Sequence, residues 1–136
     1  MDLRSRLLVE DNMLLLTLEE PVGTEQRAAL AQAVDQLVDE HRPAGLVLTL
    51  GAAAGTAATV SVVLRAYRHW AAAGLPMAVA TPQAAVRYLI RANQPALPVH
   101  APTHDALRAV RALVRRQGGV DDLLPRPWGQ DGAARQ

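Results

Sequence analysis

The stretch 45–74 constrains the fold of this chain more than any other part of it, because a continuous apolar run, a loop of small residues and a long amphipathic segment follow one another there. The run 46–50 lacks the alternation of a half-exposed strand, so we expect a central strand that is covered on both faces. Apolar side chains then recur at helical spacing over 57–73, which predicts a helix that ends at Gly74. A buried strand that leads into a helix is typical of an α/β fold.

Two apolar runs and a first helix precede this stretch. The runs 7–10 and 13–18 are separated by an Asp-Asn pair at 11–12, and they predict an opening hairpin. The first helix is expected to start at an N-cap, Thr24, and to end before Pro43.

Two further strand–helix pairs follow it. Strands are expected at 77–80 and 99–101, and helices are expected after Pro82 and Thr103. Strands that are linked by helices favour right-handed crossovers and neighbouring parallel strands. The sequence therefore predicts an α/β fold with a mixed, largely parallel sheet of about five strands covered by about four helices.

Composition and length narrow the function classes. The chain has 136 residues, enough for about one domain, and its formal net charge of +1 is too small to indicate nucleic acid or a membrane surface as a partner. Cysteine is absent, which excludes disulfides and thiolate catalysis. No segment approaches the length of a signal peptide or of a membrane span of about 20 apolar residues, so we expect a soluble cytoplasmic protein without direct membrane insertion.

The residues that could carry catalysis or bind a metal are scattered. His100 and His104 have i,i+4 spacing, but Pro102 lies between them, so they do not share a helix face. Adjacent carboxylates at 19–20 and 121–122 point in different directions and make poor acid–base pairs. We therefore expect a protein that is not an enzyme and that has no catalytic residues, no metal and no cofactor.

Several segments, in this order, resemble the STAS domain (sulfate transporter and anti-sigma-factor antagonist) over residues 3–116. They are VSVVLRAY at 60–67, AAGLPM at 72–77, TPQAAVRYL at 81–89, and LPVH at 97–100 with DAL at 105–107. The resemblance implies a STAS-like domain at 1–116, and the Gly- and Pro-rich residues 117–136 are expected to form a flexible tail. It also implies a transcription regulator that binds a protein partner, an anti-sigma factor of the histidine-kinase-like ATPase type.

The chain departs from the family at the regulatory position. In the family, the partner phosphorylates a serine at the start of this second helix, and the aligned residues here are Ala57 and Ala58, which have no hydroxyl. A phosphate adds about −1.5 to −2 charge to such a contact. We therefore expect a constitutive binder, or a scaffold, that lacks this switch. Thr56 and Thr59 flank the gap, and each is either a structural residue or a candidate phosphoacceptor; Thr56 fits an N-cap.

The partner-binding surface is predicted from the small-residue loop and from the helix face opposite the apolar stripe. The stripe consists of Val60, Val63, Leu64, Tyr67 and Ala71. The loop 51–59 is rich in Ala and Gly and would let another backbone come close. The predicted binding residues are Gly51, Gly55, Thr56, Ala58, Thr59, Val62, Arg65, Ala66 and His69. Self-association through the same surface is compatible with this prediction.

Three alternative functions remain open. STAS-like proteins also serve as cytoplasmic subunits of membrane transporters or as scaffolds in sensory complexes, where the helix start needs no phosphate. A small ligand-binding domain or enzyme would instead use the loop 51–59 as a pocket. Only Thr56 and Thr59 would supply polar groups to that pocket.

Overall fold

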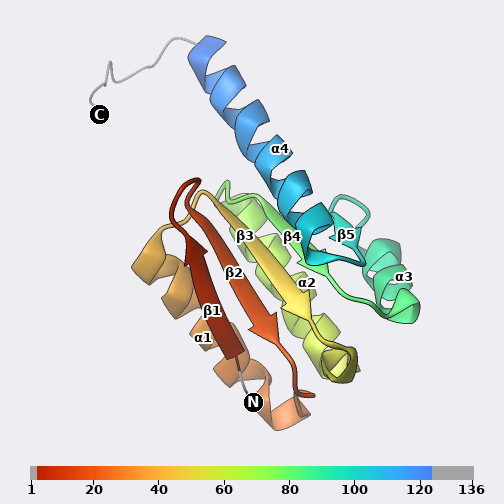
Figure 1. Cartoon of the computed structure of the whole chain (residues 1–136). Coiled ribbons are helices and arrows are strands. Elements are labelled where there is room, and N and C mark those ends of the chain that lie inside the picture. Colours follow the sequence, from red (N-terminus) through yellow and green to blue (C-terminus); the bar gives the residue numbers. More distant parts are fainter. Residues whose placement is uncertain (1–2, 124–136) are drawn as a thin grey trace.

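The computed structural model describes residues 3–123 of the chain, with side chains described from 3 to 117. Its centre is a five-stranded sheet in which the strands lie in sequence order (Figure 1). The strands are β1 (Leu3–Leu8), β2 (Met13–Leu18), β3 (Gly45–Leu50), β4 (Met77–Ala80) and β5 (Val99–His100). β1 and β2 pair antiparallel, and every later neighbouring pair is parallel. The predicted mixed, largely parallel sheet is therefore confirmed.

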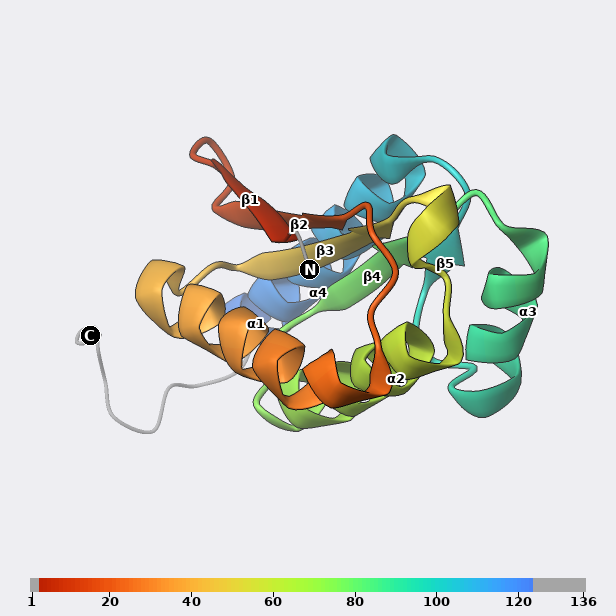
Figure 2. The same ribbon diagram turned by 90° about the horizontal axis from the view of Figure 1, so that it is seen from below.

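Helices cover both faces of this sheet. They are α1 (Arg27–His41), α2 (Ala57–Ala72), α3 (Ala84–Asn93) and α4 (Thr103–Leu123), with short 3-10 turns η1 (Thr24–Gln26) and η2 (Ala52–Ala54). Figure 2 shows α1 and α2 side by side on one face and α4 on the other. α3 packs beside α2 and β5 at the edge of the sheet. No helix within residues 3–123 combines the length and the apolar character that crossing a membrane requires.

Alternating side chains of the strands divide the core into two parts. Leu46 and Leu48 of β3 are buried on the side of α1 and α2, whereas Val47 between them packs with Val110 of α4. Burying one such side chain stabilises the fold by about 1.5–3 kcal/mol. α4 comes so close to the sheet that a Cβ on Gly45 would collide with Val110. The central strand is thus covered on both faces, as its unbroken apolar run predicted.

Two element boundaries near the N-terminus differ from the prediction. The first strand spans Leu3–Leu8 rather than 7–10, because Asn12 adopts φ 56° and closes a longer turn after it. The predicted N-cap, Thr24, is instead the first residue of η1, and Gly23 is the cap. The Gly23 amide donates to Gln26 Oε1 at 3.0 Å, which supplies the reciprocal half of a capping box.

The C-terminal helix is longer than expected. The sequence predicts a domain that ends at residue 116, whereas α4 continues to Leu123 through Gly118 and Gly119. Each glycine costs a helix about 1 kcal/mol relative to alanine. Gln117 Nε2 donates a hydrogen bond to the Gly74 carbonyl at 3.2 Å, which anchors α4 at residue 117. The helix can continue from this formed turn without the cost of a new nucleation step. Residues 124–136 of the predicted tail lie outside the described residues.

Candidate protein-binding site at the start of helix α2

Helix α2 begins at a threonine N-cap. Thr56 has an extended backbone (φ −90°, ψ 163°), and its Oγ1 accepts a hydrogen bond from the Thr59 amide at 3.2 Å. The same hydroxyl donates to the Val22 carbonyl at 3.2 Å, which ties the helix start to the chain that leads into η1. The capping role predicted for Thr56 is confirmed, and such a cap typically contributes about 1 kcal/mol.

Thr59 completes this network from inside the molecule. Its side chain is fully buried at 0% exposure, and its Oγ1 lies 2.9 Å from Thr56 Oγ1. Because the Thr56 hydroxyl donates to Val22, the Thr59 hydroxyl is the donor of this contact. The prediction that Thr59 belongs to the exposed surface is wrong. Phosphorylation of either threonine would first have to break the network that starts the helix.

The loop before α2 is held in place by close packing on its two glycines. The carboxylate of Glu19 occupies the position that a Gly51 side chain would take, and the Gly51 amide donates to the Leu18 carbonyl at 2.8 Å. Gly55 is packed in the same way by Gln83, whose side-chain amide donates to the Ala52 carbonyl. The glycines therefore shape the loop, and their own surfaces are half-covered.

Alanines form the exposed part of the helix start. Ala52 and Ala53 of η2 and Ala57 in the first turn of α2 are exposed, and Ala58 is half-buried. None of these side chains can donate or accept a hydrogen bond. They present methyl groups on a backbone that is held by the threonine network and by the hydrogen bond from Gln83.

The outward face of α2 is rotated relative to the prediction. Val62 is only 4% exposed and lies in the main core, and Ala66 packs half-buried against the same core. α1 lies against α2, so α2 must bury a stripe wide enough for both the sheet and its neighbouring helix. The expectation that Val62 and Ala66 face outward is therefore wrong.

Arg65 and His69 are exposed as predicted, and Ser61 is an exposed residue of the same helix that the predicted binding residues did not include. His69 lies with its ring edge-on to Trp70, the two ring centroids 4.5 Å apart. Ser61 is exposed one turn after Ala57, and Arg65 follows one turn later. The i, i+4, i+8 spacing of small or polar residues at 57, 61 and 65 was the signal for this face.

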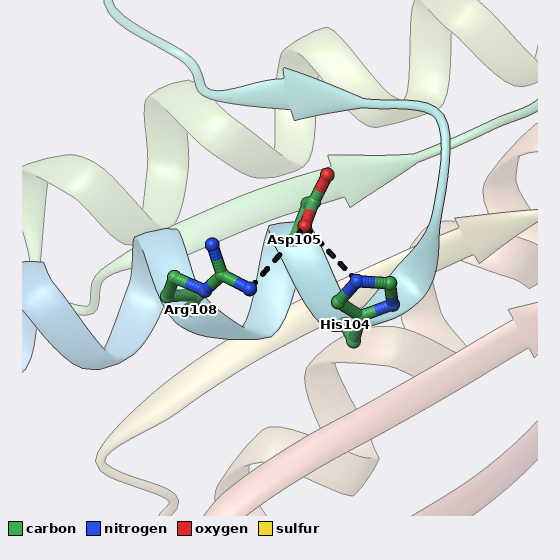
Figure 3. Close-up of polar contacts among 3 residues, drawn as sticks. All are labelled: His104, Asp105 and Arg108. Atoms are coloured by element: carbon green, nitrogen blue, oxygen red, sulfur yellow. Dashed lines mark ion pairs between the residues drawn. The ribbon is translucent and has the colours of Figure 1, made fainter.

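Within the part of the chain whose side chains are described, a histidine and a carboxylate form an ion pair at the start of α4, away from the start of α2. Asp105 Oδ1 is 3.2 Å from His104 Nε2 and 3.8 Å from Arg108 Nη2 (Figure 3). The His104 and Arg108 side chains are about three-quarters exposed, so this cluster contributes little to stability. Asp105 in the first turn also interacts favourably with the helix dipole. The cluster involves no residue of the α2 start.

Comparison with solved structures identifies the fold. A serine-to-glutamate variant of RsbS from Moorella thermoacetica aligns with a TM-score of 0.68 and 13% identity, over 85% of this chain and 99% of that one. A chain from the stressosome, described as a signal integration and transduction hub, aligns at 0.63 and 14%, over 77% and 95%. An anti-sigma factor antagonist from Mycobacterium paratuberculosis aligns at 0.61 and 19%, over 81% and 95%.

These likenesses show that the chain has a STAS-like fold, as the sequence resemblance predicted. Their identities are too low to transfer more than the fold. No protein-family model and no curated protein matches the sequence.

Proposed function

We propose that this chain is a non-enzymatic regulator of the anti-sigma-factor-antagonist type, which binds a protein partner through the start of helix α2. The observation that carries the proposal is the exposed alanine surface on a rigid backbone, with Ala57 on the helix and Ala52 and Ala53 on the turn before it. A preorganised apolar surface loses little conformational freedom when a partner docks. The proposed partner is an anti-sigma factor of the histidine-kinase-like ATPase type.

Binding in this proposal is not switched by phosphorylation at the helix start. Ala57 and Ala58 offer no hydroxyl, and the hydroxyls of Thr56 and Thr59 are engaged in the capping network. The chain would thus bind its partner constitutively.

The burial of individual side chains revises the binding residues. The proposed contact surface is made of Ala52, Ala53, Ala57, Ala58, Ser61, Arg65 and His69. Gly51, Gly55 and Thr56 would act indirectly, since they shape and cap the structure that presents this surface. Thr59, Val62 and Ala66 support it from the core side.

A scaffold role in a sensory complex is the second candidate function. The observation that favours it is the likeness to a stressosome chain, at a TM-score of 0.63. In that case the same surface would contact other subunits of the complex, including further copies of this chain.

The experiment is affinity capture from the native cell extract with the full-length chain as bait. Ala58→Asp places a charge on the proposed surface, at an early helix position where a carboxylate is compatible with the dipole, so the variant should remain folded. Ala96→Asp is the matched control, because Ala96 is exposed and lines a cavity with Gly74 and Ala71 at the other end of α2. Capture of an ATPase-type anti-sigma factor by wild type and Ala96→Asp, but not by Ala58→Asp, is the expected result.

Other results separate the candidates. Recovery of a large complex with many copies of this chain would favour the scaffold role. Equal capture by all three baits would exclude the α2 start as the contact surface.

A further inference from the structure

A groove runs between the start of α1 and the exposed face of α2. It encloses about 370 Å³ and is lined on one side by the η1–α1 start, including Arg27, and on the other by Ser61 and Arg65. We propose that this groove binds an acidic segment of the protein partner, with the two guanidinium groups as the recognition elements. The choice of a partner's segment rests on the proposed function, because the groove adjoins the proposed contact surface.

The charge of the groove is the first argument. Arg27 and Arg65 are both exposed, and neither has a carboxylate within ion-pair distance among the described residues. Arg27 uses Nε to donate to the Thr24 carbonyl at 3.4 Å, which orients the guanidinium and leaves its terminal nitrogens available. Guanidinium groups form paired hydrogen bonds with carboxylates, so two of them on one groove favour an acidic ligand.

The remaining lining favours a peptide over a nucleic acid or a free phosphate. The lining includes Val62, which is only 4% exposed, and two hydroxyl residues, Thr24 from η1 and Ser61 from α2. Hydroxyls of this kind can pair with the main chain of an extended peptide. Glu25 adds a carboxylate to the lining, so the groove carries one net positive charge. A nucleic acid or inorganic phosphate offers no peptide main chain to the two hydroxyls, so the lining favours an acidic protein segment.

The position of the groove links it to the helix start. Ser61 and Arg65 follow Ala57 at successive turns on the same exposed face of α2. A partner that contacts the alanine surface can therefore extend directly into the groove. In this arrangement the guanidinium groups of the groove select an acidic partner segment, whereas the alanines supply apolar contact.

The test needs no natural partner. The isotope-labelled full-length chain is titrated with a hexaglutamate peptide and, as a neutral match, with hexaglutamine, and backbone amide shifts are followed by NMR. We expect hexaglutamate to shift amides of 24–28 and 61–65 and hexaglutamine to leave them in place. Arg27→Gln and Arg65→Gln should each weaken hexaglutamate binding about three- to fivefold, the range for one exposed charge-assisted contact. Arg115→Gln, which removes an exposed arginine of α4, should leave the affinity unchanged.

Two outcomes would overturn the inference. Hexaglutamate shifts that map to the arginines of α4, or no specific shifts at all, would remove the groove as an acidic-ligand site. If inorganic phosphate or a single-stranded oligonucleotide shifts the groove amides more strongly than hexaglutamate does, the groove binds a phosphate-bearing ligand and not a protein segment. These titrations use the isolated chain, so their failure would remove the groove without affecting the proposed partner binding. A failure of partner capture would likewise leave the binding of hexaglutamate to the groove unaffected.

Discussion

Thr56 and Thr59 share a hydrogen-bond network that fixes the start of helix α2. Thr56 Oγ1 accepts the Thr59 amide at 3.2 Å and lies 2.9 Å from the Thr59 hydroxyl, while it donates to the Val22 carbonyl. The hydroxyls of Thr56 and Thr59 thus have a structural role. Between them, the two positions that face outward or partly outward are alanines.

The cap network predicts the cost of losing its central hydroxyl. Thr56→Ala removes the cap, the link to Val22 and the acceptor of the buried Thr59 hydroxyl, so we expect a loss of about 1–3 kcal/mol in the free energy of unfolding. Thr56→Ser keeps the hydroxyl and should cost much less. Urea denaturation of the three proteins measures both differences. Equal stability of Thr56→Ala and wild type would contradict the network.

The packing of Gln83 on Gly55 predicts a coupled pair. Gly55→Ala places a methyl group against the Gln83 side chain and Val86, and overpacking of this kind typically costs about 1–3 kcal/mol. Adding Gln83→Ala should recover part of that loss, because it removes one of the two clashing groups. A double-mutant cycle by chemical denaturation gives the coupling energy between the two positions. Additive effects would show that the two side chains do not meet.

The rotated face of α2 makes opposite predictions for two nearby positions. Val62→Asp buries an unpaired carboxylate in the main core and should destabilise the protein by about 3 kcal/mol or more. Arg65→Asp alters an exposed position and should change the free energy of unfolding by less than about 0.5 kcal/mol. Thermal and urea unfolding of both variants decide the matter. Comparable stability of the two variants would indicate that Val62 faces outward, as the sequence predicted.

The proposed absence of a phosphorylation switch predicts no modification at the start of α2. Incubation of wild type with ATP and the captured ATPase partner should leave its intact mass unchanged. Ala57→Ser restores an exposed hydroxyl next to the cap and serves as the comparison, because its mass can increase by one phosphoryl group. Phosphate mapped to Thr56 or Thr59 of wild type would show that the partner can open the cap network.

The order of strands and helices could be predicted because each element carries its own apolar pattern. The unbroken run that became β3 and the helical spacing that became α2 are local signals. The resemblance to STAS domains then predicted how these elements are arranged in one fold. The length of α4 could not be predicted from composition, since the contact of Gln117 with Gly74 comes from the tertiary structure.

The candidate site was predicted less well, because burial at its edges depends on neighbouring elements. Val62 looked outward on an isolated helix, but α1 packs beside that helix and buries it. Thr59 was predicted to lie on the binding surface, but its side chain is buried and its hydroxyl contacts the Thr56 hydroxyl. Ser61 was not predicted as a binding residue, although its i+4 spacing from Ala57 places it on the exposed face of α2, where it lines the groove.

The most direct measurement is the affinity of the captured partner for three purified proteins: wild type, Ala58→Asp and Ala96→Asp. If the start of α2 is a constitutive docking surface, wild type and Ala96→Asp should bind equally tightly, and Ala58→Asp should bind at least about tenfold more weakly, a loss of about 1.4 kcal/mol. Circular dichroism of each variant controls for folding. Unchanged affinity for Ala58→Asp in a folded protein would contradict the proposed binding site.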